Sequence, residues 1–326
     1  MQNLPRLFKR FPVFNLGKFM STKSRTFEEI QIPVPWGHIA GKWWGSKDKR
    51  PILCIHGWQD NCGTFDPLVQ HLPSCVPFLT IDLPGHGLSS QIPSGLFYNG
   101  FDLVILLRRI MNYFNWSKLS LMGHSLGGIT SYLYATTFPN MVDFVICFDT
   151  ATPMTEIGGH VNCTPEIIDK FLFYDEANCS NKEPPSYPYE NLEKILHKGS
   201  GESVDLDKCK YLIARNVKQS KVDTSKYYFT RDPRVKCQFF MAWFYKKLVK
   251  DGSKFKNPAM EIEAVYDFRE NWNPFLYNEI MDIFKENNEN FQLYKFKGTH
   301  HFHLNNSAKV SEILNPFIEK YFSGDQ

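Results

Sequence analysis

Lys118-Leu-Ser-Leu-Met-Gly-His-Ser-Leu-Gly-Gly128 is the stretch that decides the fold. A short apolar run ends in Gly-His-Ser-Leu-Gly, and small, helix-compatible residues follow at once. This order is typical of a strand, a sharp turn that carries a serine, and a helix. Side chains at Gly123 and Gly127 would collide with the neighbouring strand and helix, because the chain folds back tightly there. The stretch therefore predicts that Ser125 projects from the turn with its hydroxyl exposed.

Apolar runs alternate with helical patterns on both sides of this turn. The predicted strands are 27–34, 37–44, 51–56, 78–82, 119–122, 142–148, 260–266 and 291–296. The predicted helices are 101–114, 126–138, 274–286 and 310–322. Strands that alternate with helices predict an α/β fold whose central sheet is mostly parallel and flanked by helices.

Residues 152–255 interrupt this alternation with a polar, irregular segment that contains Pro184-Pro185. We interpret 27–151 and 256–326 as the core of the fold, and 152–255 as an insertion at one edge of the sheet. The insertion follows the strand that ends at Asp149, so it leaves the carboxyl ends of the strands, where such sheets bind ligands. We therefore predict that it is a helical lid.

The composition is that of an ordinary globular protein, with 43% hydrophobic and 22% charged residues in 326. No apolar run approaches the roughly 20 residues that span a bilayer, so no transmembrane segment is predicted. The eight cysteines form no Cys-x-x-Cys pair, and no secretory leader precedes them. We expect them to be reduced thiols.

The net charge of +3 comes from the first 26 residues, which carry no acidic side chain. Their basic residues are Arg6, Lys9, Arg10, Lys18, Lys23 and Arg25. The rest of the chain is slightly acidic, so we expect no nucleic-acid surface. Basic residues mixed with Leu and Phe are typical of a mitochondrial transit peptide. We expect residues 1–26 to direct the protein to the mitochondrion, with a disordered tail of a cytoplasmic protein as the alternative.

Four motifs resemble those of the α/β-hydrolase superfamily, in the same order. They are His56-Gly-Trp58, Asp82-Leu-Pro-Gly-His-Gly87, Gly123-His-Ser-Leu-Gly127 and Gly298-Thr-His300. The resemblance covers about residues 27–322. Within the superfamily, the chain resembles the serine hydrolase-like (kraken-type) proteins. The resemblance lies in the opening stretch His-Gly-Trp-Gln-Asp-Asn and in the ending stretch Gly-Thr-His-His-Phe-His. The resemblance implies a nucleophile elbow and a Ser-His-Asp catalytic triad.

Ser125 and His300 are the nucleophile and base that this resemblance implies. A serine hydroxyl needs a base that takes its proton as it attacks, and an imidazole titrates in the right range. His303 is the alternative base, and His301 is expected to point to another side of the loop. The remaining histidines of the motifs, His56, His86 and His124, are expected to have structural roles.

Two strand-end aspartates compete for the third position of the triad. Asp267 ends the strand 261–267, near the position that the family commonly uses, although Ala264 stands where the family often has glycine. Asp149 ends the strand after the elbow strand, a position that some hydrolases use instead. We predict Asp267, with Asp149 as the alternative acid and Glu270 as a weaker third candidate.

The oxyanion hole implied by the family consists of the backbone N–H groups of Trp58 and Leu126. Leu126 opens the helix after the elbow, so its N–H has no partner within that helix. The predicted function is a serine hydrolase that cleaves a carboxylic ester, or a thioester or amide, through an acyl-enzyme. The abundant aromatic residues favour a small, lipophilic acyl substrate.

Two rival functions stay open from sequence. One is carbon–carbon bond hydrolysis or a lyase reaction at the same serine and histidine, and the other is a ligand-binding protein that kept only the fold. No cofactor is required by this chemistry. The histidines at 300, 301 and 303 suggest a metal site, but no second set of ligands accompanies them in the sequence, so none is predicted.

Overall fold

The computed structural model describes residues 24–150, 165–180, 182–237, 252, 255–265 and 274–325. Most of the basic leader, residues 1–23, lies outside the described residues. So do the beginning of the predicted insertion and the segment 266–273.

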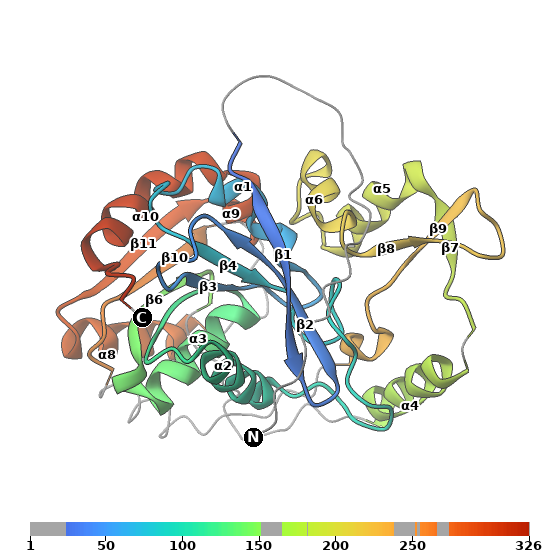
Figure 1. The fold of residues 1–326 in the computed structure, drawn as a ribbon, viewed down its shortest axis with the longest axis horizontal. Coiled ribbons are helices and arrows are strands. Elements are labelled where there is room, and N and C mark those ends of the chain that lie inside the picture. Colours follow the sequence, from blue (N-terminus) through green and yellow to red (C-terminus); the bar gives the residue numbers. More distant parts are fainter. Residues whose placement is uncertain are drawn as a thin grey trace.

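A central sheet of eight strands, in the order β1-β2-β4-β3-β5-β6-β10-β11, forms the middle layer (Figure 1). Its strands are β1 (Phe27–Val34), β2 (Gly37–Trp44), β3 (Ile52–Ile55), β4 (Phe78–Ile81), β5 (Leu119–His124), β6 (Val142–Phe148), β10 (Ala259–Val265) and β11 (Phe291–Lys297). Strand β2 pairs antiparallel with β1 and β4, and the other neighbours are parallel. The predicted α/β fold with a mostly parallel sheet is confirmed.

Successive side chains of the central strands point to opposite faces of the sheet and enter two separate cores. On β3, Leu53 and Ile55 join the core on one face, while Ile52 and Cys54 join the core on the other. Strand β6 alternates in the same way. Because both faces are covered, these strands are apolar throughout, which is why they read as continuous hydrophobic runs in the sequence.

Helices cover both faces (Figure 1). One face packs against α2 (Gly100–Phe114), α3 (Leu126–Thr137) and α8 (Pro274–Asn287). The other packs against α1 (Asp66–Val69), α9 (Phe302–Asn305) and α10 (Ser307–Tyr321). The apolar positions of α2 recur at helical spacing, Asn99 caps its N-terminus, and Asn115 ends it in the left-handed conformation.

The insertion leaves the sheet after β6 and returns at β10. Its described elements are α4 (Pro165–Cys179), β7 (Ser186–Pro188), α5 (Tyr189–Gly199), α6 (Cys209–Ile213), β8 (Val217–Gln219) and β9 (Lys226–Phe229). The three strands form a small antiparallel sheet in the order β7-β9-β8. Since β6 and β10 pair with each other, the insertion emerges between two neighbouring strands of the central sheet. The expectation that it lies at a sheet edge is therefore wrong.

None of the described helices is long and apolar enough to cross a membrane. The cysteines of the described residues are free thiols, and Cys54 and Cys147 are buried in the two cores as small apolar groups.

Candidate active site

Ser125 occupies a strained turn between β5 and α3. Its φ of 51° and ψ of −115° are unusual for a residue with a side chain, and such strain persists only where the surroundings enforce it. A Cβ at Gly123 would lie 2.2 Å from the carbonyl oxygen of Gly127, and one at Gly127 would lie 2.0 Å from that of Ile55. The steric reason for these two glycines is as the sequence predicts.

His300 lies in the loop between β11 and α9, and its Nδ1 is 2.5 Å from Oδ2 of Asp149. The Asp149 side chain is fully buried, whereas the His300 ring is 28% exposed. The other carboxylate oxygen, Oδ1, accepts the N–H of Ala264 in β10 at 2.7 Å. Asp149 also has a positive φ of 61°, directly after the last residue of β6. Its carboxylate is thus fixed by two neighbouring strands and aimed at one imidazole nitrogen.

Two hydrogen bonds link the serine turn to the loops that carry His300 and Asp149. The N–H of Ser125 donates to the carbonyl oxygen of Phe148, the residue before Asp149 (3.0 Å). Nε2 of His124, the residue before Ser125, donates to the carbonyl oxygen of His300 (3.0 Å). The loops that carry the serine, the histidine and the aspartate therefore contact one another directly at the carboxyl ends of the parallel strands, the edge of the sheet where ligands bind.

The carboxylate that the structure places against His300 is that of the alternative acid, Asp149. Asp267 and Glu270 lie outside the described residues. Among the described residues, Asp149 is the carboxylate that accepts the N–H at Nδ1 of His300. The two other histidines of the loop have different partners: His301 Nδ1 contacts the Ser203 hydroxyl at 2.8 Å, and His303 Nε2 contacts that of Thr64 at 2.9 Å.

The two residues of the predicted oxyanion hole, Trp58 and Leu126, both lie beside Ser125 in the chain or in space. Leu126 is the first residue of α3, with Ser125 as its N-cap, so its N–H points out of the helix. Trp58 follows Gly57, at which a Cβ would lie 3.3 Å from Cβ of Ser125. The first loop therefore passes directly beside the serine. Positive potential at the helix N-terminus adds to the two N–H groups.

His56 and His86 support the loops around the serine, as expected. Nε2 of His56 accepts the N–H of Leu83 at 2.9 Å, and its Nδ1 donates to the carbonyl oxygen of Gly57 at 2.7 Å. Nε2 of His86 accepts the N–H of Gln59 at 3.2 Å. Burial lowers the pKa of His56 to about 4 and that of His86 well below its usual value, so both rings are neutral.

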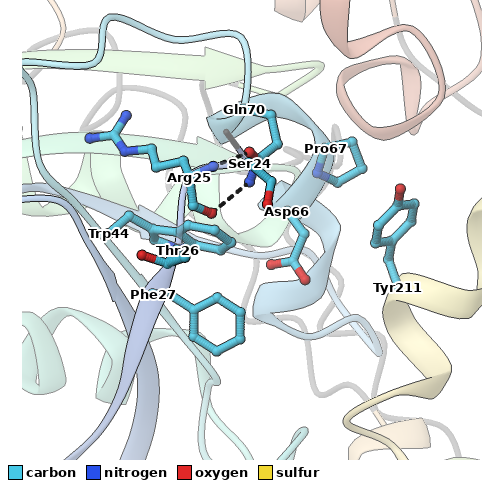
Figure 2. Close-up of a pocket in the computed structure, with 9 residues that line it drawn as sticks. All are labelled: Ser24, Arg25, Thr26, Phe27, Trp44, Asp66, Pro67, Gln70 and Tyr211. Carbon is cyan, nitrogen blue, oxygen red and sulfur yellow. Dashed lines mark hydrogen bonds between the residues drawn. The ribbon is translucent and has the colours of Figure 1, made fainter. Parts of the chain in front are cut away.

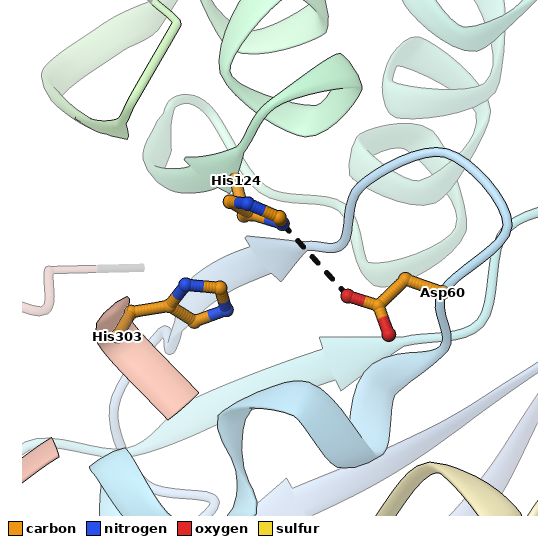
Figure 3. A group of neighbouring side chains, drawn as sticks. All are labelled: Asp60, His124 and His303. Carbon is orange, nitrogen blue, oxygen red and sulfur yellow. Dashed lines mark ion pairs between the residues drawn. The ribbon is translucent and has the colours of Figure 1, made fainter. Parts of the chain in front are cut away.

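His124 joins a buried group that the sequence did not predict. Asp60, His124 and His303 point toward one another (Figure 3). Burial raises the pKa of Asp60 to about 7. Burial also lowers the pKa of His124 well below its usual value, and the imidazoles of His303 and His300 lower it further. The sequence offered one signal for Asp60, its place four residues after His56 in the first loop.

Side chains of the insertion hold the loops of the site from the other side. Nε1 of Trp58 donates to the carbonyl oxygen of Val235 at 2.5 Å, and Nη1 of Arg231 donates to that of Gln59 at 2.6 Å. The buried Arg215 guanidinium forms an ion pair with Asp82 at 2.8 Å. The described part of the insertion is therefore bonded to two of the loops that surround Ser125.

A separate pocket of about 480 Å³ lies between the β1–β2 hairpin and α1 (Figure 2). It is lined by Ser24, Arg25, Thr26, Phe27, Trp44, Asp66, Pro67, Gln70 and Tyr211. Ser125, His300 and Asp149 are not among these residues, and within the pocket the backbone of Arg25 and the side chain of Gln70 are hydrogen-bonded to each other. The pocket is distinct from the candidate active site.

Comparisons with known proteins agree with this geometry. Residues 50–162 match the model of a family described as alpha/beta hydrolase fold. A probable serine hydrolase of Drosophila melanogaster is 34% identical over 297 residues, which cover 90% of this chain and 88% of that protein. A serine hydrolase-like protein of Danio rerio is 32% identical over 92% of this chain and 90% of its own.

Solved structures show the same fold at lower identity. A hypothetical protein of Pseudomonas aeruginosa PAO1 superposes with a TM-score of 0.75 and 22% identity, over 90% of this chain and 99% of that one. The thioesterase domain from the curacin biosynthetic pathway superposes with a TM-score of 0.68 and 15% identity, over 89% of this chain and 99% of its own. With the relatives above, the strained serine turn and the loops around it identify the chain as a member of the serine hydrolase-like proteins, within the α/β-hydrolase fold.

Proposed function

We propose that this protein is a serine hydrolase that cleaves a carboxylic ester through an acyl-enzyme, with Ser125, His300 and Asp149 as its triad. The observation that carries the proposal is the 2.5 Å contact between Asp149 Oδ2 and His300 Nδ1. The residue before Asp149, Phe148, accepts the N–H of Ser125, so the serine turn lies next to this pair. A carboxylate on Nδ1 holds the proton there and leaves Nε2 as the base for the serine hydroxyl. Asp149 thereby takes the role that the sequence favoured for Asp267.

The reaction proceeds in two halves. In the first, Oγ of Ser125 attacks the carbonyl carbon while Nε2 of His300 takes its proton, and the C–O bond to the alcohol breaks as the imidazolium returns that proton to the leaving oxygen. In the second, Nε2 of His300 takes a proton from a water whose oxygen attacks the acyl carbon. The bond between that carbon and Oγ of Ser125 then breaks as the imidazolium returns its proton to Oγ, which releases the acid and restores Ser125. The buried Asp149 carboxylate stabilises the imidazolium in both halves.

The N–H groups of Trp58 and Leu126 complete the proposed site. Both are backbone groups fixed in space, so they stabilise the negative charge that develops on the carbonyl oxygen without reorganising. Such donors contribute on the order of 10²–10³ in rate each. The insertion is proposed to act as a lid over a small lipophilic acyl substrate, because Val235 and Arg231 of that segment bond the loop that carries Trp58.

A fluorophosphonate probe tests the proposal. The probe phosphonylates an activated serine, so we expect stoichiometric labelling of the wild-type protein at Ser125 and none of Ser125→Ala. The second arm measures hydrolysis of p-nitrophenyl esters of increasing acyl length, with rapid quenching and mass spectrometry to detect acyl-Ser125. Absence of labelling in the folded wild-type protein, or equal labelling of Ser125→Ala, would overturn the proposal.

The same experiment separates the rival functions. A ligand-binding protein that kept only the fold would bind esters without turnover and without labelling. An enzyme that breaks carbon–carbon bonds would be labelled by the probe, yet no acyl-Ser125 would accumulate from any ester.

A further inference from the structure

Asp60, His124 and His303 form a buried cluster behind the serine turn, and each comes from a different loop of the site. Asp60 lies in the loop after β3, His124 ends β5, and His303 lies in α9. The three residues are 4%, 1% and 0% exposed. One ligand atom from each lies within 4.8 Å of the other two, and the side chains surround a common space (Figure 3).

Nδ1 of His124 is directed at Asp60 and has no hydrogen-bond partner among the described residues. The Thr64 hydroxyl and the backbone N–H of Asn61 donate to Asp60, and the same hydroxyl contacts Nε2 of His303 at 2.9 Å. Buried polar atoms are nearly always paired, and leaving one unpaired costs about 1–3 kcal/mol, more for a charged group. An unpaired imidazole nitrogen that is fully buried beside a carboxylate indicates a missing partner between His124 and Asp60.

The hydrogen bonds on the far sides of the rings determine what that partner must be. Nε2 of His124 lies 3.0 Å from the carbonyl oxygen of His300, which can only accept, so this nitrogen carries the proton. In the neutral ring, Nδ1 of His124 is then a bare lone pair, 3.8 Å from Oδ2 of Asp60. Two acceptors therefore face each other, an arrangement that a cation between them would stabilise.

The nearby Arg231 guanidinium stabilises the Asp60 carboxylate through its charge but does not contact it directly. Arg231 donates from Nη1 to the carbonyl oxygen of Gln59, and the described residues contain no ion pair between Arg231 and Asp60. His301 brings a further nitrogen instead, since its Nε2 also lies 3.8 Å from Oδ2 of Asp60 while its Nδ1 contacts Ser203.

We propose that Asp60, His124 and His303 bind a divalent transition-metal ion, with Zn²⁺ as the best match and His301 at the edge of the site. Imidazole nitrogens and a carboxylate oxygen are typical ligands of Zn²⁺ at about 2.0–2.2 Å. In a tetrahedral arrangement such ligands lie roughly 3.4 Å apart. The 3.8 Å between His124 Nδ1 and Asp60 Oδ2 is close to this separation, and one ligand atom of each of the three residues lies within 4.8 Å of the others.

The ion would link the three loops that surround Ser125. The loop that contains Asp60 also contains Trp58. His124 directly precedes Ser125 in the sequence, and His303 lies three residues after His300. His303 is further held by stacking on Phe148, at 5.3 Å between ring centroids and 8° between planes. The site is thus structural: its ligands reach the metal from behind, while the serine and His300 stay on the substrate side.

Zn²⁺ binding to wild-type protein that has been freed of metal by a chelator is the direct test. We expect one Zn²⁺ per chain by equilibrium dialysis, and X-ray absorption of the loaded protein should show only nitrogen and oxygen ligands in its first shell. Co²⁺ in the same site should give visible d–d bands of a low-coordinate complex. Neither readout depends on hydrolytic activity, so the test stands or falls separately from the proposed function.

Two substitutions and a control locate the ion. Asp60→Asn and His303→Phe should each weaken Zn²⁺ binding by more than the 10–100-fold that removal of an outer-shell partner costs. His303→Phe keeps a ring that can stack on Phe148. His71→Phe makes the same change at an exposed histidine and should leave binding unaltered.

Three results would each overturn the proposal. The first is that the wild type binds no stoichiometric Zn²⁺, and the second is a first shell of sulfur or of water alone. The third is equal Zn²⁺ affinity in the two substituted proteins and the control. In that case the lone pairs are paired by buried water or by a proton on His124. Because the X-ray absorption experiment uses the wild type alone, the proposal remains testable even where a substituted chain fails to fold.

Discussion

Asp149 Oδ2 lies 2.5 Å from Nδ1 of His300, although the two residues are 151 positions apart in the chain. The aspartate ends β6 and the histidine follows β11, with β10 between the two strands in the sheet. The carboxylate is anchored from β10 by the N–H of Ala264, so two neighbouring strands fix it against the His300 ring, which lies in the loop between β11 and α9. A preorganised pair of this kind is what a general base needs.

Asp149→Asn should lower kcat/KM for a p-nitrophenyl ester by about 10⁴, the loss that the equivalent change causes in trypsin. The amide donates toward His300 and favours the wrong tautomer, while the shape of the site is kept. Asp267→Asn is the matched control and should cost less than about tenfold. Steady-state kinetics with circular dichroism to confirm folding would decide between them, and a large loss in Asp267→Asn with a small one in Asp149→Asn would reverse the assignment.

Gly127→Ala should destabilise the protein and misplace Ser125. Its Cβ would lie 2.0 Å from the backbone oxygen of Ile55, which cannot move without shifting β3. We expect a loss of about 1–3 kcal/mol or more in the free energy of unfolding, and at least about 10² in kcat. Gly199→Ala is the control, because no atom lies within 4 Å of the added Cβ at the end of α5. It should leave stability unchanged or raise it by up to about 1 kcal/mol. Urea unfolding of both proteins checks this, and equal stabilities would contradict it.

Arg215→Met should destabilise the contact between the insertion and the core. Burial alone would raise the pKa of Asp82, but the Arg215 guanidinium outweighs it and holds the pKa below its usual range. Removing one partner of a buried ion pair costs about 3–5 kcal/mol, because the other charge is left without compensation. Lys226→Met removes a lysine whose ion pair with Asp223 is largely exposed, and should leave the unfolding midpoint unchanged. Similar midpoints for Arg215→Met and the wild type would show that this ion pair does not hold the insertion.

Stability should fall as the pH drops below about 6.5. His56 and His86 are neutral in the folded protein, with pKa values lowered by burial, to about 4 for His56. In the unfolded chain a histidine takes up a proton near pH 6.5, so below that pH the unfolded state binds more protons and is favoured. Each such histidine contributes about 1.4 kcal/mol per pH unit between pH 6.5 and its folded pKa. Urea unfolding at a series of pH values between 7.5 and 5 measures the slope.

His86→Gln isolates one of these contributions. The amide accepts the N–H of Gln59 in place of the ring, but it takes up no proton, so the slope of stability against pH should be smaller than in the wild type by about one proton. The exposed His71→Gln is the control, and its slope should match that of the wild type. Identical slopes for all three proteins would mean that His86 titrates normally in the folded state.

Most of the fold could be predicted from the sequence, because its signals are local. The β1–β2 hairpin and β6 have the predicted bounds, and α2 and α3 begin and end within one residue of the predicted ones. Buried strands appear as apolar runs, amphipathic helices as 3.6-residue periodicity, and the serine turn as glycines where a Cβ has no room. The predictions for Ser125, Leu126, Trp58 and His300 rest on the same kind of signal, since each residue lies in or beside a short motif.

The tertiary structure alone decided which carboxylate meets His300 and which groups gather behind Ser125. Strands β6 and β10 both end beside the same loop, and both carry an aspartate at or soon after that end, so local pattern does not distinguish Asp149 from Asp267. The choice depends on strand order and on the turn that gives Asp149 its positive φ, which arise from contacts between residues far apart in the chain. The cluster of Asp60, His124 and His303 has the same origin, because a loop, a strand end and a helix far apart in the chain contribute one side chain each. Periodicity and motifs indicate the local structure that each segment prefers by itself. Contacts between residues of different segments depend on how those segments pack together.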